Sequence, residues 1–312
     1  MKKSGVVQIP FAWLFAIIVG MAVLAIAIFA VTKIVDTGET QVDAKMGREI
    51  GVLLNPLETG FESLRASSFT MPVKTRIYGG CNNNGYFGRQ IIQVSQQSFN
   101  KWTETDIDVG FSNKYIFAEK PVEGKKFYIF SKPFDFPFKV ASLIYLTSAE
   151  EKYCFTNAPE EILDELETTN QENFRFGEEC LGTETNVCFE TGSDCDVLVK
   201  IGQGYVQKQS DTVYFESEAL MYAAIFSDPE VYECQLKRLM QRVVSLVEIY
   251  KDKAELTSRS GCNFDLERDL TLLGNQARNI IEKDSSINLD SSTIANAELI
   301  GTKNDLMSCK LW

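Results

Sequence analysis

An uninterrupted apolar run near the N-terminus constrains this chain more than any other feature. The run extends from Ile9 to Val31 and contains no charged side chain and no strongly polar one. Its 23 residues cover about 34 Å as an α-helix, and the hydrocarbon core of a bilayer is about 30 Å thick. The sequence therefore predicts one membrane-spanning helix, with nearly all of the protein on one side of the membrane.

Charge and length around this run give the expected orientation. The stub of residues 1–8 carries Lys2 and Lys3, and basic flanks favour the cytoplasmic side of a membrane. A removable secretory signal has an apolar core of about 7–15 residues, which is shorter than this run. We therefore expect a retained signal anchor, with a removed signal peptide as the alternative. The expected protein is a single-pass cell-membrane protein, with residues 9–32 in lipid, a cytoplasmic N-terminus and an extracellular C-terminal domain.

The chain beyond the span is long and acidic. The 312-residue chain has a net charge of −12, and the first 34 residues hold three of its 31 basic side chains and none of its 43 acidic ones. An acidic surface repels nucleic acid, so no nucleic-acid partner is expected. Histidine is absent, which excludes Ser-His-Asp triads and imidazole-based zinc sites.

Eight cysteines follow the span, and their even number favours disulfides. No pair has C-x-x-C spacing, so neither a zinc ribbon nor a thioredoxin-like redox site is expected. We expect four disulfides on the oxidising side of the membrane, with at least one local bridge in the cluster around Cys188; reduced, buried thiols are the alternative. The pairing stays open, and the candidates are Cys81, Cys154, Cys180, Cys188, Cys195, Cys234, Cys262 and Cys309.

Apolar residues continue at helical spacing beyond the span. They recur every three or four residues, with the 11-residue period of a straight α-helix. The spanning helix is therefore expected to continue as an amphipathic stalk over residues 33–68, kinked at Pro56. The stripe either packs on the protein's own ectodomain or pairs with other protein subunits, the partners expected for this helix. Its members are Val42, Met46, Ile50, Leu53, Leu57, Phe61 and Leu64.

From residue 69 to residue 216 the pattern changes to that of β-strands. Short β-branched and aromatic runs alternate with turn residues, which predicts an antiparallel, β-rich ectodomain over 69–216. The predicted strands cover 73–78, 90–95, 115–118, 126–130, 139–146, 197–201, 204–207 and 212–215. A dense aromatic stretch either packs in the core or forms an exposed loop that touches a partner or the membrane surface; it comprises Phe127, Phe130, Phe134, Phe136 and Phe138.

Residues 217–312 are predicted to form a helical hairpin and a tail that pack on the ectodomain. The segment Ser227-Asp228-Pro229-Glu230 combines a cap, a first-turn proline and a capping-box glutamate. A helix is therefore expected from there to 256, and a second follows over 265–283. Shorter helices are expected over 158–169 and 218–226, and the end, 293–312, predicts one or two strands that Cys309 ties to the body. The expected fold class is α+β.

The N-terminus also resembles that of type IV prepilins, including archaeal pilin-like proteins. Lys2 and Lys3, then Gly5, then a long apolar helix that enters a soluble domain match the leader and N-terminal helix of that family. In that family a peptidase cuts after the glycine, which implies Val6 as the first mature residue. The family usually has Glu at the fifth mature position, where this chain has Pro10. The resemblance covers the N-terminal region only and implies assembly through this helix.

The remaining motifs give no enzymatic site. Asp106 and Asp108 share one face of an extended segment with Glu104, as cation ligands can, but the EF-hand spacing is missing and a solvated surface is expected. No P-loop or nucleophile-elbow motif occurs, so we expect no cofactor and no enzyme. The sequence predicts a membrane-anchored structural or adhesive protein, such as a pilin-like filament or envelope-complex subunit. A ligand-binding or sensory ectodomain with a separate membrane partner is the alternative, and a carboxylate-dependent hydrolase the third.

Overall fold

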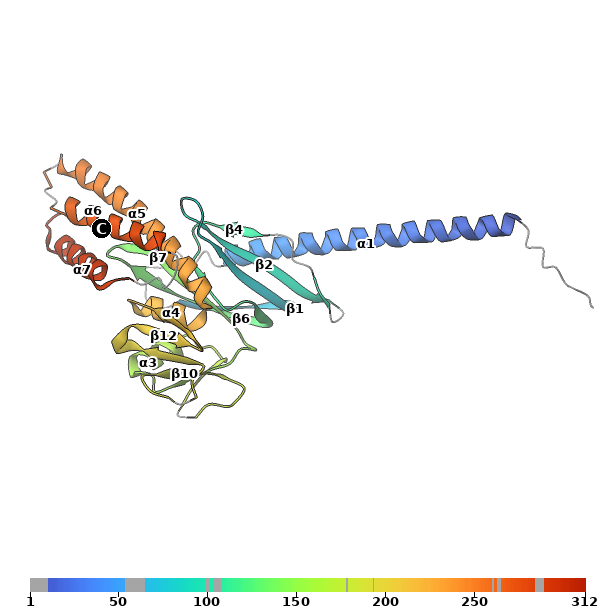
Figure 1. Ribbon diagram of the computed structural model, residues 1–312, viewed down its shortest axis with the longest axis horizontal. Coiled ribbons are helices and arrows are strands. Elements are labelled where there is room, and N and C mark those ends of the chain that lie inside the picture. Colours follow the sequence, from blue (N-terminus) through green and yellow to red (C-terminus); the bar gives the residue numbers. More distant parts are fainter. Residues whose placement is uncertain are drawn as a thin grey trace, which may run out of the picture.

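A computed structural model gives the protein an α+β fold, in which one long N-terminal helix projects from a body of two sheets and several helices (Figure 1). The fold class agrees with the prediction. The structure describes residues 11–53, 65–98, 101–103, 108–177, 179–192, 194–259, 261–262, 265–283 and 289–312.

Helix α1 (Phe11–Leu53) contains the apolar run from Phe11 to Val31 and continues well beyond it. Every side chain from Trp13 to Val31 is exposed, and this segment is long and apolar enough to cross a membrane, as an anchor or a signal sequence is. The prediction of an N-terminal apolar helix is confirmed.

The predicted stalk is too long at its C-terminal end. We expected helix over 33–68, but strand β1 starts at Arg65. Ser67 and Ser68 pair with β6 instead, because serine competes poorly for helix and the next residues, Phe69 and Thr70, favour an extended backbone. Of the predicted stripe, Leu57, Phe61 and Leu64 lie outside the described residues, as does Pro56.

The first sheet is almost wholly antiparallel. Its strand order is β3-β2-β1-β6-β7-β5, with β4 paired to β2, and only β5 and β7 run parallel. It contains the long predicted strands of the ectodomain, and here the antiparallel prediction is correct. Its strands are β1 (Arg65–Asn82), β2 (Arg89–Ser98), β3 (Lys101–Trp102), β4 (Val109–Phe111), β5 (Ile116–Phe117), β6 (Val122–Asp135) and β7 (Lys139–Ser148).

The second sheet is mixed, and for it the antiparallel prediction is wrong in part. In the order β13-β12-β11-β10-β8-β9, strand β10 runs parallel to β8 and β11, and β8 runs parallel to β9. Parallel neighbours need crossover connections, and α3 (Glu160–Thr168) supplies the one between β8 and β9. The strands are β8 (Tyr153–Thr156), β9 (Phe174–Phe176), β10 (Thr185–Phe189), β11 (Val197–Lys200), β12 (Tyr205–Lys208) and β13 (Asp211–Tyr214).

Four helices complete the body: α4 (Glu218–Phe226), α5 (Pro229–Ser258), α6 (Glu267–Glu282) and α7 (Ser291–Leu306). Helices α5 and α6 pack on each other as the predicted hairpin. The strands predicted for the tail are wrong, since residues 291–306 form α7. Its buried positions recur at helical spacing but several are polar, so their period escapes a search for apolar residues; they are Thr293, Asn296, Ala297, Ile300 and Asn304.

The main core lies where α4 joins the two sheets. All residues from Ala219 to Phe226 are buried, and α4 contacts β6 and β7 of the first sheet and β12 and β13 of the second. The ring of Phe226 lies within 6.4 Å of six other aromatic rings, so aromatic packing binds both sheets into one body. The predicted aromatic stretch belongs to the core, because all five of its phenylalanines are buried.

All eight cysteines form disulfides, as predicted. Cys188–Cys195 is the expected local bridge, and Cys309 ties the C-terminal tail to the α5–α6 turn through Cys262. The remaining two, Cys81–Cys234 and Cys154–Cys180, join β1 to α5 and β8 to the segment before β10.

Candidate functional site

The C-terminal end of α1 is seated on the first sheet. Ile50, a member of the predicted stripe, is 2% exposed and packs in a cluster with Ile77, Ile92, Ile116 and Ile129. At this position the stripe packs on the protein's own ectodomain, one of the two alternatives. The side chains of Val42, Met46 and Leu53 lie outside those that the structure describes.

Two glycines allow α1 to approach the sheet closely. A β-carbon at Gly51 would lie 2.1 Å from the Phe111 ring, and one at Gly47 would lie 3.1 Å from Val109 Cγ2. Both glycines and Ile50 are buried, at a four-residue spacing that puts Gly47 and Gly51 on the same helix face. Larger side chains would therefore push α1 off β4.

Helix α5 is attached to the same sheet near the end of β1. Cys234 of α5 is bonded to Cys81 of β1. The amide of the next residue, Gln235, donates to Gln90 Oε1 and, at 3.1 Å, to the Ile116 carbonyl. Since Gln90 and Gln235 are fully buried, this polar contact stabilises one register of α5 against the sheet.

Arg238 completes this attachment. Its guanidinium is fully buried, with Nη1 2.8 Å from the Lys114 carbonyl, Nη2 3.0 Å from the Ser112 carbonyl and Nε 3.2 Å from the Phe87 carbonyl. Burial lowers the pKa of Arg238 to about 10, so it stays charged at neutral pH. One cation thus ties α5 both to the loop before β5 and to the turn between β1 and β2.

That turn presents two aromatic side chains. Tyr86 is 75% exposed and its ring stacks edge-on against Phe87 at 4.6 Å. Gly85 and Gly88 flank them with φ values of +85° and +58°, a backbone that favours glycine. Sequence reasoning missed this turn as a candidate surface, although the run Gly85-Tyr86-Phe87-Gly88 was a usable signal.

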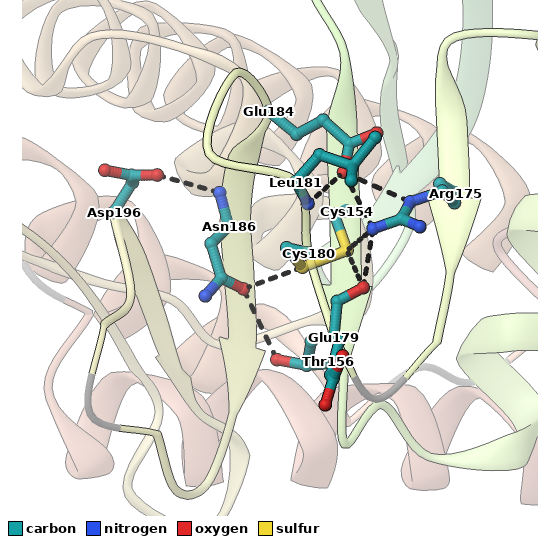
Figure 2. A network of polar contacts seen from close by, with 9 residues as sticks. All are labelled: Cys154, Thr156, Arg175, Glu179, Cys180, Leu181, Glu184, Asn186 and Asp196. Atoms are coloured by element: carbon teal, nitrogen blue, oxygen red, sulfur yellow. Dashed lines mark hydrogen bonds and ion pairs between the residues drawn. A yellow bond between two sulfur atoms is a disulfide. The ribbon is translucent and has the colours of Figure 1, made fainter.

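The second sheet carries a stapled lobe, defined here as residues 150–196. Figure 2 shows its Cys154–Cys180 disulfide between Arg175 and Asn186. Arg175 donates to Cys154 Sγ at 3.7 Å and pairs with Glu184 at 2.9 Å. On the other side, Asn186 Oδ1 lies 3.3 Å from Cys180 Sγ and 3.5 Å from Cys188 Sγ. Asn186 therefore connects the two disulfides of the lobe.

This lobe also brings together a set of metal-ligating residue types. The ligand atoms of Cys154, Cys180 and Glu184 lie within 4.8 Å of one another. Thiolates bind metals, but here both sulfurs share a disulfide bond, and Glu184 is engaged by Arg175 and by the Leu181 amide. The residues in this state do not fit a metal ion.

Several ionisable groups lie together where the β5–β6 connection, the end of β12 and the α4–α5 connection meet. Lys208 donates to the Ser227 carbonyl at 2.9 Å and lies 3.8 Å from Glu119, while Asp228 accepts from the Lys120 amide. Burial raises the pKa of Glu119, whereas burial lowers the pKa of Lys208. These side chains bind backbone at the joints between strands and helices, so their visible role is structural.

Glu151 adds a carboxyl group to the same region. Its Oε1 accepts from the Glu123 amide at 3.4 Å, whereas its Oε2 is buried and has no partner among the described residues. Burial, helped by the nearby Glu119 charge, raises the pKa of Glu151 to about 7. A carboxyl group with this pKa exchanges its proton near neutral pH, which makes it a determinant of pH-dependent stability.

The remaining predicted residues are only partly described. Gly5 and Val6 lie outside the described residues, as do Glu104 and Asp106. Asp108 is exposed and accepts a hydrogen bond from Gln93. The expectation that this acidic segment is a solvated surface is therefore tested only at Asp108, which is exposed.

Comparison of the chain with known protein families, with curated proteins and with solved structures finds no match. Any functional conclusion must therefore rest on helix α1, on its contact with the first sheet and on the disulfide-bonded body.

Proposed function

We propose that this protein is a non-enzymatic, membrane-anchored extracellular subunit that acts through protein–protein contacts in a filament or an envelope complex. The observation that carries the proposal is α1. Its N-terminal part is apolar and exposed on all faces, while its C-terminal part is seated on the first sheet through Gly47, Ile50 and Gly51. One continuous helix thus connects the bilayer to the body.

The construction of the body supports a structural role. The Cys81–Cys234 disulfide and the Arg238 hydrogen bonds join the sheet that holds α1 to the C-terminal helices. Cross-links between segments far apart in sequence restrict opening of the body. The disulfides also support an extracellular place for it, since such bonds persist in oxidising compartments. The basic residues Lys2 and Lys3 support a cytoplasmic N-terminus.

The resemblance to type IV prepilins supports assembly through α1. It makes a specific claim, since processing in that family would remove residues 1–5 and leave Val6 as the first residue. This chain has Pro10 where pilins usually have Glu. Membership of an envelope complex, the second form of the proposal, is compatible with that difference. In either assembly, the exposed apolar length of α1 contacts lipid or the same helix of other subunits.

Native protein purified from its own membranes tests the proposal. We expect intact-mass analysis to give a chain with four disulfides, and N-terminal sequencing to begin at Val6 if the pilin-like version is correct. Negative-stain images should then show filaments or discrete oligomers. An intact Met1 would reject pilin-like processing but keep an envelope complex. Free thiols together with a monomeric native protein would reject the proposal as a whole.

A further inference from the structure

Charge is distributed very unevenly over the body. Residues 63–103, which include the β1–β2 hairpin, contain five Lys or Arg and no Asp or Glu. The stapled lobe, residues 150–196, contains 14 Asp or Glu and only Lys152 and Arg175 as bases. Figure 1 shows the tip of the hairpin beside β4 and the lobe with α3 and β10 across the body from it, on opposite sides of the α1 axis. Surfaces of opposite sign, placed in this way, attract each other between parallel copies of the chain.

The hairpin tip has the properties of a binding anchor. Tyr86 is 75% exposed, and Arg89, three residues further, is exposed with no ion-pair partner among the described residues. By contrast, the other described hairpin cations Lys74 and Arg76 pair with Glu123. The tip is held in place, because Arg238 binds the Phe87 carbonyl and Gln241 binds the Asn83 carbonyl at 2.8 Å. A rigid exposed aromatic side chain loses little entropy on binding.

The stapled lobe contains a hollow whose volume is close to that of one aromatic ring. It holds about 160 Å³ and is lined by Leu166, Phe176, Glu167, Glu172, Asn170 and Gln171. A cavity of about 150 Å³ with apolar walls accommodates one benzene ring. Phe176 is partly exposed and provides most of the apolar contact, because Leu166 is only 1% exposed. The Glu167 carboxylate provides negative charge at the rim, whereas Glu172 pairs with Lys126 at 3.1 Å.

One buried side chain that lines this hollow, Gln171, lacks a hydrogen-bond acceptor for its amide nitrogen within the part of the chain that the structure describes. Gln171 is 8% exposed, and its amide nitrogen has no hydrogen-bond partner among the described residues. The orientation of the amide is fixed: Asn173 donates to Thr147 Oγ1, and Thr147 donates to Gln171 Oε1 at 3.1 Å. The nitrogen is thus left as a donor, and a buried donor without an acceptor costs about 1–3 kcal/mol. This nitrogen is buried from solvent, so a phenol oxygen would accept its hydrogen bond once the lining side chains part to admit the ring.

We propose that Tyr86 of one copy of this chain inserts into the Leu166–Phe176 hollow of the next copy, with Arg89 beside Glu167. The ring contacts Leu166 and Phe176, and the hydroxyl accepts from Gln171. Because tip and hollow are different surfaces of the same molecule, the contact is head-to-tail and leaves a free tip and a free hollow at the two ends. Repetition gives a row of copies with parallel α1 helices. This inference rests on the proposed function and identifies its partner as a second copy of the chain.

Sedimentation velocity of the full chain in detergent tests the contact. We expect concentration-dependent self-association that Tyr86→Ala weakens at least about tenfold, as for an aromatic anchor at an interface. Tyr86→Phe should weaken it by about two- to tenfold, since it loses only the hydrogen bond with Gln171. Tyr214→Ala is the matched control, because Tyr214 is also an exposed tyrosine, on β13, and it should change nothing.

Charge reversal makes the test independent of folding defects. Arg89→Glu alone and Glu167→Arg alone should each weaken self-association, because both residues are exposed and each change places like charges together. In a mixture of the two single variants, both contacts between unlike chains pair opposite charges. The unchanged tip of the Glu167→Arg chain meets the unchanged hollow of the Arg89→Glu chain, and the reversed tip of the second chain meets the reversed hollow of the first. The mixture should therefore associate more tightly than either variant alone, with the two chains alternating.

The outcomes separate this inference from the proposed function. A wild-type chain that stays monomeric, a Tyr86→Ala chain that associates like wild type, or a mixture that shows no recovery would each overturn the Tyr86 contact. If native membranes nevertheless contain oligomers that survive Tyr86→Ala, the proposed function stands with another interface. If the native wild-type protein is monomeric in its membrane, both proposals are wrong.

Discussion

The substitution Gly51→Ala tests how α1 is attached to the body. A β-carbon at residue 51 would lie 2.1 Å from Cζ of Phe111 and 2.5 Å from Cε1. The ring has limited freedom to withdraw, because the Phe111 carbonyl accepts from Arg238 and its strand pairs with Gln90. Overpacking of this kind costs about 1–3 kcal/mol. The α1 seat should therefore open about 5- to 150-fold more often.

Hydrogen exchange of the full chain in detergent, followed by mass spectrometry, measures this opening. Peptides that cover 47–53 and 109–111 should exchange faster in Gly51→Ala, by the factor given above. The matched control is Gly20→Ala, because no atom lies within 4 Å of a β-carbon at Gly20, and exchange at the seat should not change.

A second variant identifies the cause. In a Phe111→Ala background the ring is gone, so the added penalty of Gly51→Ala should disappear, as a double-mutant cycle detects. Exchange in Gly51→Ala equal to that of wild type would refute the close packing of α1 on β4. A penalty that persists without the Phe111 ring would refute the assigned contact.

Three further substitutions test the body. Arg238→Met should lower the free energy of unfolding by about 3 kcal/mol or more, because it leaves buried carbonyls without donors; a denaturant titration showing a loss below about 1 kcal/mol would contradict the role of this residue. Glu151→Gln should remove a pH dependence of the free energy of unfolding. Burial raises the pKa of Glu151 in the folded protein to about 7. The contribution of this carboxyl group to stability is therefore fully present below its unfolded-state pKa and is lost as the pH rises through about 7. Between pH 5 and pH 8 the free energy of unfolding of the wild type should thus fall by on the order of 2 kcal/mol relative to that of Glu151→Gln. If the stabilities of the two proteins change with pH in the same way, the assigned role of Glu151 is wrong. Gly192→Ala would put a β-carbon 2.2 Å from Cys195 Sγ and 2.6 Å from Cys188 Sγ, so thiol titration under denaturing conditions should find two free thiols; none would show that the turn adapts.

Strong local signals predicted much of the fold. The apolar run, the start of α5 with its first-turn Pro229 and the α5–α6 hairpin have periods and start signals that single sequences display. Asp228 occupies the N-cap position of α5, but its side chain makes no capping hydrogen bond. Helix α7 was missed because its inner face uses Thr293, Asn296 and Asn304. The Asp290 side chain, which accepts from the Thr293 amide at 2.8 Å as an N-cap does, was the signal that could have found it.

Contacts between distant segments could not be predicted in this way. The parallel pairs around β10 depend on crossover connections, and strands of four or five residues carry too little pattern to show their direction. The same holds for the seat of α1: Gly51 reads as a helix-weakening residue in sequence, and its role emerges only when Phe111 is placed against it. The hollow at Gln171 is likewise invisible until α3 and β9 are packed together.

Cross-linking of the native chain in intact membranes tests membrane-anchored assembly most directly. With a short amine-reactive reagent, separation by mass should give a ladder at multiples of the chain mass, with four disulfides in every chain. A single band at the mass of one chain, unchanged over a range of reagent lengths and concentrations, would contradict assembly through protein–protein contacts.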